Sequence, residues 1–382
     1  MKRCLGLCLF LAVLSPVPGI HAADLTIMTQ NQYLGADLSP LFAASDFTAF
    51  NEAALAALRQ VAATRPAERI QALAAEIAKQ APALVGLQEV FVFGCVDLAP
   101  SGADVGCNDP SLREAFVDHL QGTLDALDGA YAQKAVVVNL NLTTPGVPLY
   151  VGGFPGGFPV LVQVMDRDVI LARSGVAATP VDFTAVCSKP SADGCNYDSV
   201  LSGDTPLGPI AVERGFVAVD ATVDGRDYRF VNTHLEVKFP PETGLSIVQA
   251  LQASQLVLAL QHASPPPGSA LIVIGDMNSS PVDRPVGLPT PYEQFFAAFR
   301  TDAWRLRPGN ASEFTCCQLG DLSNHKSALY ERVDLIFSLD PPARVKRARV
   351  VGATVSDKTP PPGVPTALWP SDHGAVIADL QF

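Results

Sequence analysis

A series of six short polar motifs constrains the fold more than any other feature of this sequence. Five of them directly follow an apolar run, and the sixth stands at the start of one. The motifs are Asn31, Gln88-Glu89, Asn232-Thr233-His234, Gly275-Asp276-Met277-Asn278, Arg332-Val333-Asp334 and Ser371-Asp372-His373. Because rigid scaffolds hold functional groups at the ends of their strands, the series predicts a polar site that is built from several strand ends.

The apolar runs themselves predict strands, and segments with helical periodicity lie between them. Helices are expected over 48–63, about 67–79 and about 244–262. Strands are expected over 25–28, 83–87, 136–139, 160–165, 169–172, 216–223, 228–233, 271–274, 333–337 and 375–380. Asp224-Gly225 is a hairpin signal between two of these strands. The mixture predicts a layered α/β sandwich in one domain, with the Pro-rich stretches 264–267 and 359–366 as loops.

Residues 1–23 have the features of a secretory signal peptide. Lys2 and Arg3 precede a long apolar run, and the small residues Ala22 and Ala23 follow it. A membrane anchor is the alternative, but the run contains prolines and is short for a bilayer span. We therefore expect residues 24–382 to form the mature domain and to be secreted or periplasmic.

Six cysteines remain after the predicted signal peptide, an even number that favours disulfides in an exported protein. They are Cys95 and Cys107, Cys187 and Cys195, and the adjacent pair Cys316 and Cys317. The first two pairs are local and lie in Gly- and Asp-rich sequence. The adjacent pair could bridge only through a strained ring, or could pair elsewhere. A zinc site is the competing interpretation, but no histidine lies at ligand spacing to these cysteines.

The six motifs, in this order, resemble those of the endonuclease/exonuclease/phosphatase superfamily. This is the family of DNase I, bacterial sphingomyelinases, abasic-site endonucleases and inositol-polyphosphate 5-phosphatases. The resemblance extends from Thr26 to Phe382 and includes the helix that precedes the Gln88-Glu89 motif. It implies a DNase I-like, four-layered α/β/β/α sandwich, a single domain with loop insertions. The site is then expected at one end of the two sheets.

The resemblance also implies a metal site. Glu89 is similar to the principal metal ligand of the family, and Asn31 and Asp372 are similar to supporting ligands or to the groups that orient them. Mg²⁺ or Mn²⁺ is the expected cofactor, because both prefer carboxylate, carbonyl and water oxygens. The sequence leaves open whether one or two metal ions act.

The resemblance assigns the remaining five residues to catalysis. Asp276 and Asn278 are similar to the pair that orients the attacking water and holds the phosphate. His373 with Asp334 resembles the pair that acts on the nucleophilic water, and a carboxylate beside a histidine fixes its tautomer and raises its pKa. His234 resembles the histidine that contacts the phosphate and protonates the leaving group. The sequence identifies no carboxylate partner for His234.

Two features bear on the substrate, which we expect to be a phosphodiester. The net charge of −12 and the absence of a Lys or Arg run disfavour nucleic acid, although acidic nucleases that work with divalent cations exist in this family. Residues 149–161 are apolar, aromatic, rich in Gly and Pro, and free of charge. As an exposed loop they would make a peripheral membrane contact. The alternative is that they cover the core or a sheet edge.

The favoured function is hydrolysis of a phospholipid head group or another small phosphodiester, similar to a sphingomyelinase or phospholipase C. A DNase I-like secreted nuclease is the alternative, and a non-catalytic binding module is a minor one. No protein partner is implied.

Overall fold

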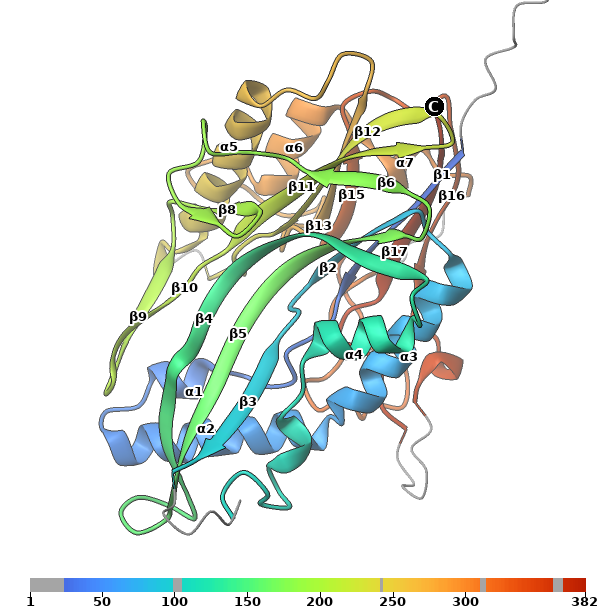
Figure 1. Cartoon of the computed structure of the whole chain (residues 1–382). Coiled ribbons are helices and arrows are strands. Elements are labelled where there is room, and N and C mark those ends of the chain that lie inside the picture. The colour runs from blue at the N-terminus through green and yellow to red at the C-terminus, as the bar shows by residue number, and fades with distance from the viewer. Residues whose placement is uncertain (1–23, 99–104, 241–242, 310–313, 360–366) are drawn as a thin grey trace, which may run out of the picture.

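The structure, a computed structural model, describes residues 24–98, 105–240, 243–309, 314–359 and 367–382. Two β-sheets pack face to face, and helices cover the outer face of each sheet (Figure 1). The predicted four-layered α/β/β/α sandwich is confirmed by this arrangement. The predicted signal peptide, residues 1–23, and most of the Pro-rich stretch 359–366 lie outside the described residues.

The first sheet has seven strands in the order β16-β17-β1-β2-β5-β3, with β4 paired to β5. They are β1 (Asp24–Asn31), β2 (Leu84–Gln88), β3 (Val92–Asp97), β4 (Tyr131–Val151), β5 (Phe158–Arg173), β16 (Arg344–Val351) and β17 (Ala375–Gln381). Strand β1 is parallel to β2 and antiparallel to β17. The ends of β1 and β2 therefore lie beside the start of β17.

The second sheet has eight strands in the order β14-β15-β13-β12-β11-β8-β7, with β6 paired to β11. They are β6 (Ala177–Pro180), β7 (Pro190–Ser191), β8 (Gly194–Asn196), β11 (Gly215–Val223), β12 (Arg226–His234), β13 (Ala270–Asp276), β14 (Thr301–Asp302) and β15 (Asp334–Ser338). The predicted Asp224-Gly225 hairpin joins β11 to β12. A separate hairpin consists of β9 (Leu201–Thr205) and β10 (Gly208–Val212).

The helices lie outside the two sheets. The α-helices are α1 (Ser39–Phe42), α2 (Phe47–Ala63), α3 (Pro66–Gln80), α4 (His119–Ala126), α5 (Ser246–His262), α6 (Pro291–Phe299) and α7 (Ala303–Leu306), and short 3₁₀ turns occur at Arg113–Ala115 and Val355–Asp357. Helices α3 and α4 pack on the first sheet, and α5 and α6 pack on the second. Helices α2, α3 and α5 confirm the three predicted helices. Among the described residues, no helix has the length and apolar character that crossing a bilayer requires.

The core between the sheets is mostly apolar, and among the polar side chains buried in it is the amide of Asn232. Fully buried side chains such as Ile27, Ile170 and Ile272 alternate along their strands and fill the space between the sheets. Asn232 on β12 crosses this space, and its Nδ2 donates to the carbonyl oxygens of Leu87 (2.9 Å) and Val169 (3.1 Å) in the other sheet. A buried amide that finds its partners across the core fixes how the two sheets lie relative to each other.

Strand β5 differs from the prediction. The segments 160–165 and 169–172 were expected to be two strands, but they form one continuous strand. The sequence Asp166-Arg167-Asp168 between them interrupts the apolar run without ending the strand. Because successive side chains point to opposite faces, the two aspartates share one buried face, and Arg167 on the other face pairs with Asp118 at 2.6 Å.

Strands β3, β4 and β5 continue beyond the second sheet as a long arm, and α1 and α2 lie against it (Figure 1). Asn51 of α2 anchors the helix near the tip, because its side chain accepts from the backbone nitrogen of Tyr150 (2.7 Å) and donates to its oxygen (3.1 Å). The apolar segment 149–161 forms this tip. Its ends belong to β4 and β5 and are buried, whereas Phe154 and Phe158 are 37% and 49% exposed.

The structure contains three disulfides. Cys95 is joined to Cys107 and Cys187 to Cys195, which confirms both predicted local pairs. Of the two alternatives for the adjacent cysteines, the structure has the bond between Cys316 and Cys317 themselves.

Replacing the amide between the sheets is expected to destabilise the protein. Asn232→Ala removes one hydrogen bond from each of the carbonyls of Leu87 and Val169 and one from the amide of Gln88, so we expect a loss of about 2–4 kcal/mol in the free energy of unfolding. Urea unfolding followed by circular dichroism measures it. Asn141→Ala, at an exposed position of β4, is the control and is expected to cost less than about 0.5 kcal/mol. Equal stability of the two variants would contradict this role.

Candidate active site

The structure brings all eight predicted site residues to one end of the sandwich. The first sheet contributes the end of β1, the residue after β2 and the loop before β17, and the second contributes the ends of β12 and β13 and the start of β15. The residues are Asn31, Glu89, Asp372 and His373 from the first sheet and His234, Asp276, Asn278 and Asp334 from the second. Parallel pairing of β12 with β13 and the register pair of Asp276 with Asp334 make these strand ends coincide.

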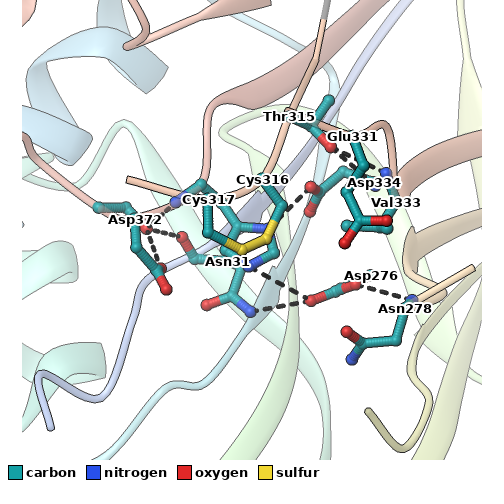
Figure 2. The surroundings of a disulfide bond; sticks show 12 residues. Asn31, Asp276, Asn278, Thr315, Cys316, Cys317, Glu331, Val333, Asp334 and Asp372 are labelled. Atoms are coloured by element: carbon teal, nitrogen blue, oxygen red, sulfur yellow. Dashed lines mark hydrogen bonds and ion pairs between the residues drawn. A yellow bond between two sulfur atoms is a disulfide. The ribbon is translucent and has the colours of Figure 1, made fainter. Parts of the chain in front are cut away.

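Asn31 connects the two halves of the site. Its Nδ2 donates to Glu89 Oε1 in the first sheet at 3.1 Å. The same atom donates to Asp276 Oδ2 in the second sheet, also at 3.1 Å (Figure 2). Asn31 Oδ1 accepts from the backbone nitrogen of Tyr33, and Glu89 Oε2 accepts from that of Leu34 (2.8 Å). These contacts fix Glu89, whose backbone has a left-handed conformation (φ 53°) that costs energy in a residue other than glycine.

A buried arginine holds the two loops of the first sheet together. Arg69 of α3 donates to the carbonyl oxygens of Gln32 (2.9 Å), Tyr33 (3.2 Å) and Pro370 (3.1 Å). The first two follow Asn31, and Pro370 precedes Asp372. Arg69 could not be identified from the sequence, because its position in an amphipathic helix gives no sign that its side chain points inward.

Several buried carboxyl groups from the two sheets lie close together in the site. Burial raises the pKa of Asp372 to about 7, and the neighbouring Glu89 carboxylate contributes to the increase. Burial also raises the pKa of Asp276, and Asp334 adds to the effect. Carboxylates that raise each other's pKa in this way are stabilised by a cation between them. The ligand atoms of Asp276, Asp334 and His373 all lie within 4.8 Å of one another. With the neighbouring carboxylates of Glu89 and Asp372, this acidic end of the sandwich could hold a divalent metal ion.

His373 and Asp334 form a close pair. His373 Nδ1 lies 2.8 Å from Asp334 Oδ2, and the ring's Nε2 lies 3.7 Å from Asp276 Oδ2. Burial alone would lower the pKa of His373, but the carboxylates of Asp334, Asp276 and Asp372 raise it well above its ordinary value. The pair predicted from the Arg-x-Asp and Ser-Asp-His motifs is therefore in contact.

His234 has an unexpected partner. Its Nδ1 lies 3.1 Å from Nη1 of Arg214, so the partner of this histidine is a cation and not a carboxylate. A guanidinium only donates, so Nδ1 must accept and the proton must be on Nε2. Burial, Arg214 and His373 lower the pKa of His234 well below its ordinary value. His234 is therefore a neutral donor, and its Nε2 lies 3.4 Å from Asp276 Oδ2 and 3.2 Å from Asn278 Nδ2.

Arg214 belongs to a buried charged group beneath His234. It lies 4.0 Å from Asp166 and 3.6 Å from Glu236, and Asp168 on the same face of β5 accepts from Asn139 at 3.0 Å. This group was not predicted. Two aspartates inside the apolar run of β5 are a sign of a buried polar group. No local feature marks Arg214, because only the fold brings it to the histidine.

The disulfide between Cys316 and Cys317 forms part of the site wall (Figure 2). The backbone groups of Cys316 and Glu331 are hydrogen-bonded to each other. The backbone nitrogen of Gln318 donates to the carbonyl oxygen of Asp372 at 2.8 Å. A ligand atom of His373 lies within 4.8 Å of both sulfurs. The sulfurs therefore stand directly beside the histidine of the close pair.

The sequence profile of the endonuclease/exonuclease/phosphatase family matches residues 49–373. The chain belongs to this family. Members of the endonuclease/exonuclease/phosphatase family hydrolyse phosphoric esters and depend on divalent metal ions, so this chain is a phosphoester hydrolase. A search of curated protein sequences finds no match to the chain.

Two solved structures with TM-scores above 0.5 agree with this fold. An endonuclease/exonuclease/phosphatase family protein from Bacteroides thetaiotaomicron is 17% identical, with a TM-score of 0.53 over 95% of this chain and 99% of that one. A mannosyl-6-phosphatase from the same organism is 16% identical, with a TM-score of 0.53 over 94% and 100%. Truncated TDP2 from Caenorhabditis elegans is 14% identical, with a TM-score of 0.46 over 94% and 98%.

The tautomer of His234 can be tested in solution. Because its pKa is lowered below the ordinary value of 6.5, we expect the neutral form with the proton on Nε2 at pH 7. Nitrogen-15 NMR of the histidine rings in the metal-free protein measures this directly. His262, exposed on α5, supplies the reference signal in the same spectrum. A doubly protonated His234 ring at pH 7 would contradict the assignment.

Proposed function

We propose that the chain is a secreted Mg²⁺-dependent phosphodiesterase that acts on a phospholipid head group or another small phosphodiester. The observation that best supports this proposal is the position of Asp276, whose Oδ2 lies between Nε2 of His234 (3.4 Å) and Nε2 of His373 (3.7 Å). One of these rings is paired with a carboxylate and the other with a guanidinium. Two imidazoles therefore face the same carboxylate oxygen, one with an Nε2 that can accept a proton and the other with an Nε2–H that can donate a hydrogen bond.

The proposed metal ligands are Glu89, Asn31 and Asp372. A phosphodiester is an anion that repels a nucleophile, and a bound divalent cation supplies charge neutralisation at this position. Asn31 orients Glu89 through its 3.1 Å hydrogen bond, and Arg69 holds the backbone on both sides. The ligands are therefore held in place by the fold.

His373, Asp334 and Asp276 are proposed to act on the attacking water. Asp334 accepts from Nδ1, so in the neutral form of the ring Nε2 is the nitrogen that takes up the water proton. Asp276 is fixed by the backbone nitrogen of Asn278, which donates to its Oδ1 at 2.9 Å, and its other oxygen faces the two histidines. It is placed to orient the water between them.

His234 and Asn278 are proposed to bind the phosphate. With Arg214 on Nδ1, the ring presents an Nε2–H donor, and the amide of Asn278 lies 3.2 Å from the same atom. Two neighbouring donors suit a non-bridging phosphate oxygen and stabilise the charge that develops there.

A lipid substrate is supported by the tip of the arm. Phe154 and Phe158 are exposed there, and Phe154 packs against Phe47 and Tyr150 with ring centroids 4.9 Å away in each case. Exposed aromatic side chains favour the interface of a membrane. The segment 149–161 is therefore proposed to make the peripheral membrane contact.

The nuclease alternative has less support. A nucleic acid needs several basic groups that are free to contact phosphates. Near the site, Arg69 is buried and bonded to carbonyl oxygens, Arg214 lies among buried acids, and Lys238 pairs with Asp283 and Glu331. The net charge of the chain is −12.

Export is proposed from the signal peptide at 1–23, with residues 24–382 as the mature domain. The disulfides agree with an extracellular or periplasmic location, because such bonds persist in oxidising compartments.

The catalytic assignment predicts the effect of two substitutions. His373→Ala and Asp276→Ala should each lower turnover at least about a hundredfold while the circular dichroism spectrum is unchanged. The assay is Mg²⁺-dependent phosphorus release from sphingomyelin and phosphatidylcholine liposomes, with plasmid DNA in a parallel tube. His262→Ala is the matched control and should keep full activity. Nicked plasmid with intact liposomes would identify a nuclease, and activity that survives both substitutions would refute the site.

The metal assignment predicts that EDTA abolishes turnover and that Mg²⁺ restores it. Glu89→Gln should raise the Mg²⁺ concentration needed for half-maximal activity at least about tenfold, since it removes the charge of the principal ligand. Glu114→Gln, on an exposed carboxylate, should leave that concentration unchanged. Hydrolysis that continues in EDTA would rule out the metal-dependent reaction.

A further inference from the structure

The two histidines of the site differ in the group that holds Nδ1. His373 Nδ1 lies 2.8 Å from a carboxylate oxygen of Asp334, whereas His234 Nδ1 lies 3.1 Å from the guanidinium of Arg214. An ionised carboxylate only accepts hydrogen bonds and a guanidinium only donates them. In their neutral forms, the two rings therefore carry the proton on opposite nitrogens.

Buried acids hold Arg214 against His234. The guanidinium lies 3.6 Å from Glu236 and 4.0 Å from Asp166, both of which are buried, and the Arg214 side chain is itself only 11% exposed. Glu236 is fixed through its backbone nitrogen, which donates to Gln252 Oε1 at 2.8 Å. Because a guanidinium is not deprotonated in proteins, Arg214 cannot become an acceptor for a proton on Nδ1.

The proton on Nε2 is then the only one that the His234 ring carries. A general acid transfers a proton in the transition state, and a neutral imidazole that loses its last proton becomes an anion. The second proton, which would make the ring an imidazolium acid, belongs on Nδ1, and Arg214 already directs a donor hydrogen to that atom. His234 can therefore donate a hydrogen bond, but it has no proton to transfer.

Asn278 supports the same assignment from the other side of the ring. Its Nδ2 donates to the carbonyl oxygen of Leu235 at 2.9 Å, which identifies the nitrogen of this amide. The same atom lies 3.2 Å from Nε2 of His234. Since neither nitrogen accepts from the other, both direct hydrogens toward an anionic oxygen, which is the arrangement that stabilises developing negative charge.

We propose that His234 supplies no proton to the leaving group and that Arg214 is the positioning residue that prevents it. The inference rests on the proposed function of the site, and it replaces the proton transfer that the family resemblance gives to His234. The water oxygen bonds to phosphorus while its proton passes to Nε2 of His373. The bond from phosphorus to the leaving oxygen breaks, its electron pair stays on that oxygen, and the resulting anion takes a proton from solvent water.

A reaction of this kind selects substrates by the acidity of the alcohol that leaves. Where a protein acid protonates the leaving oxygen, a poor leaving group loses little rate, because the proton transfer compensates for its basicity. Without that transfer, the full basicity of the leaving oxygen enters the barrier. The acidity of the leaving alcohol is therefore a specificity determinant that the site imposes on its phosphodiester substrates.

The test is a leaving-group series in solution. The mature protein is assayed with aryl esters of phosphocholine whose leaving groups range from 4-nitrophenol to phenol, with the enzyme in excess so that product release does not enter. The rate should fall at least about a hundredfold from the 4-nitrophenyl to the phenyl ester, the smaller end of the range that general acid catalysis would otherwise supply.

Two substitutions of His234 separate a hydrogen-bond donor from an acid. His234→Gln keeps an N–H donor, so it should lose no more than about tenfold in rate and keep the steep series, whereas His234→Ala should lose about a hundredfold or more with every ester. An acid could not be replaced by an amide. Selective loss of the phenyl ester in His234→Gln would therefore overturn the inference.

Substitutions of Arg214 test its positioning role. Arg214→Met removes the donor from Nδ1, so the ring can take up a second proton beside Glu236 and act as an acid, and the ratio of the two ester rates should fall at least about tenfold. Arg214→Lys keeps a cationic donor and should keep the ratio. Arg59→Met, at an exposed position of α2, is the control and should change neither rate. If Arg214→Met fails to fold, His234→Gln and Arg214→Lys decide the test.

The outcomes separate the inference from the proposed function. A flat series in the unsubstituted protein would show that a protein group protonates the leaving oxygen, which overturns the inference and keeps the phosphodiesterase. An Arg214→Met protein that slows both esters equally would overturn the positioning role of Arg214. Hydrolysis of no ester and no release from liposomes would refute the proposed function itself.

Discussion

The site exists only while the two sheets keep one relative position, and that position depends on the amide of Asn232. Its Nδ2 bonds two backbone carbonyls of the opposite sheet, and its Oδ1 accepts from Gln88 at 2.6 Å. Gly86 permits the approach, because a Cβ there would lie 2.7 Å from that oxygen. One residue beyond Gln88 is Glu89, and two beyond Asn232 is His234. The connection between the sheets is thus made next to the chemistry, where a small displacement would matter most.

Electrostatics divide the site into two sides. Toward Glu89 and Asp372 the carboxylates outnumber the cations, and burial, with a smaller contribution from Glu89, raises the pKa of Asp372 to about 7. Toward His234, the cation of Arg214 is paired with the buried acids Asp166 and Glu236. One side therefore attracts a metal ion, whereas the other holds a neutral ring in a fixed tautomer.

The sequence was sufficient where the information is local. The six motifs, the amphipathic helix at 67–79, the Asp224-Gly225 hairpin and the two short-range disulfides are each coded within a few residues, and the structure agrees with them. Features that depend on distant partners were not predictable. Strand β5 continues through Asp166 and Asp168 because Arg214 and Asn139 receive those side chains in the fold. Similarly, the inward direction of Arg69 depends on carbonyl oxygens up to 301 residues away.

The bond between Cys316 and Cys317 has a consequence for metal selectivity. Soft thiolates beside an imidazole prefer Zn²⁺ to Mg²⁺, and both sulfurs lie within 4.8 Å of a ligand atom of His373. In a disulfide neither sulfur is a thiolate, so this set cannot compete for a cation. Oxidation of the pair thereby keeps the competition among hard oxygens. In the extracellular or periplasmic location proposed above, where such bonds persist, the same oxidation would keep zinc from binding at this wall of the site.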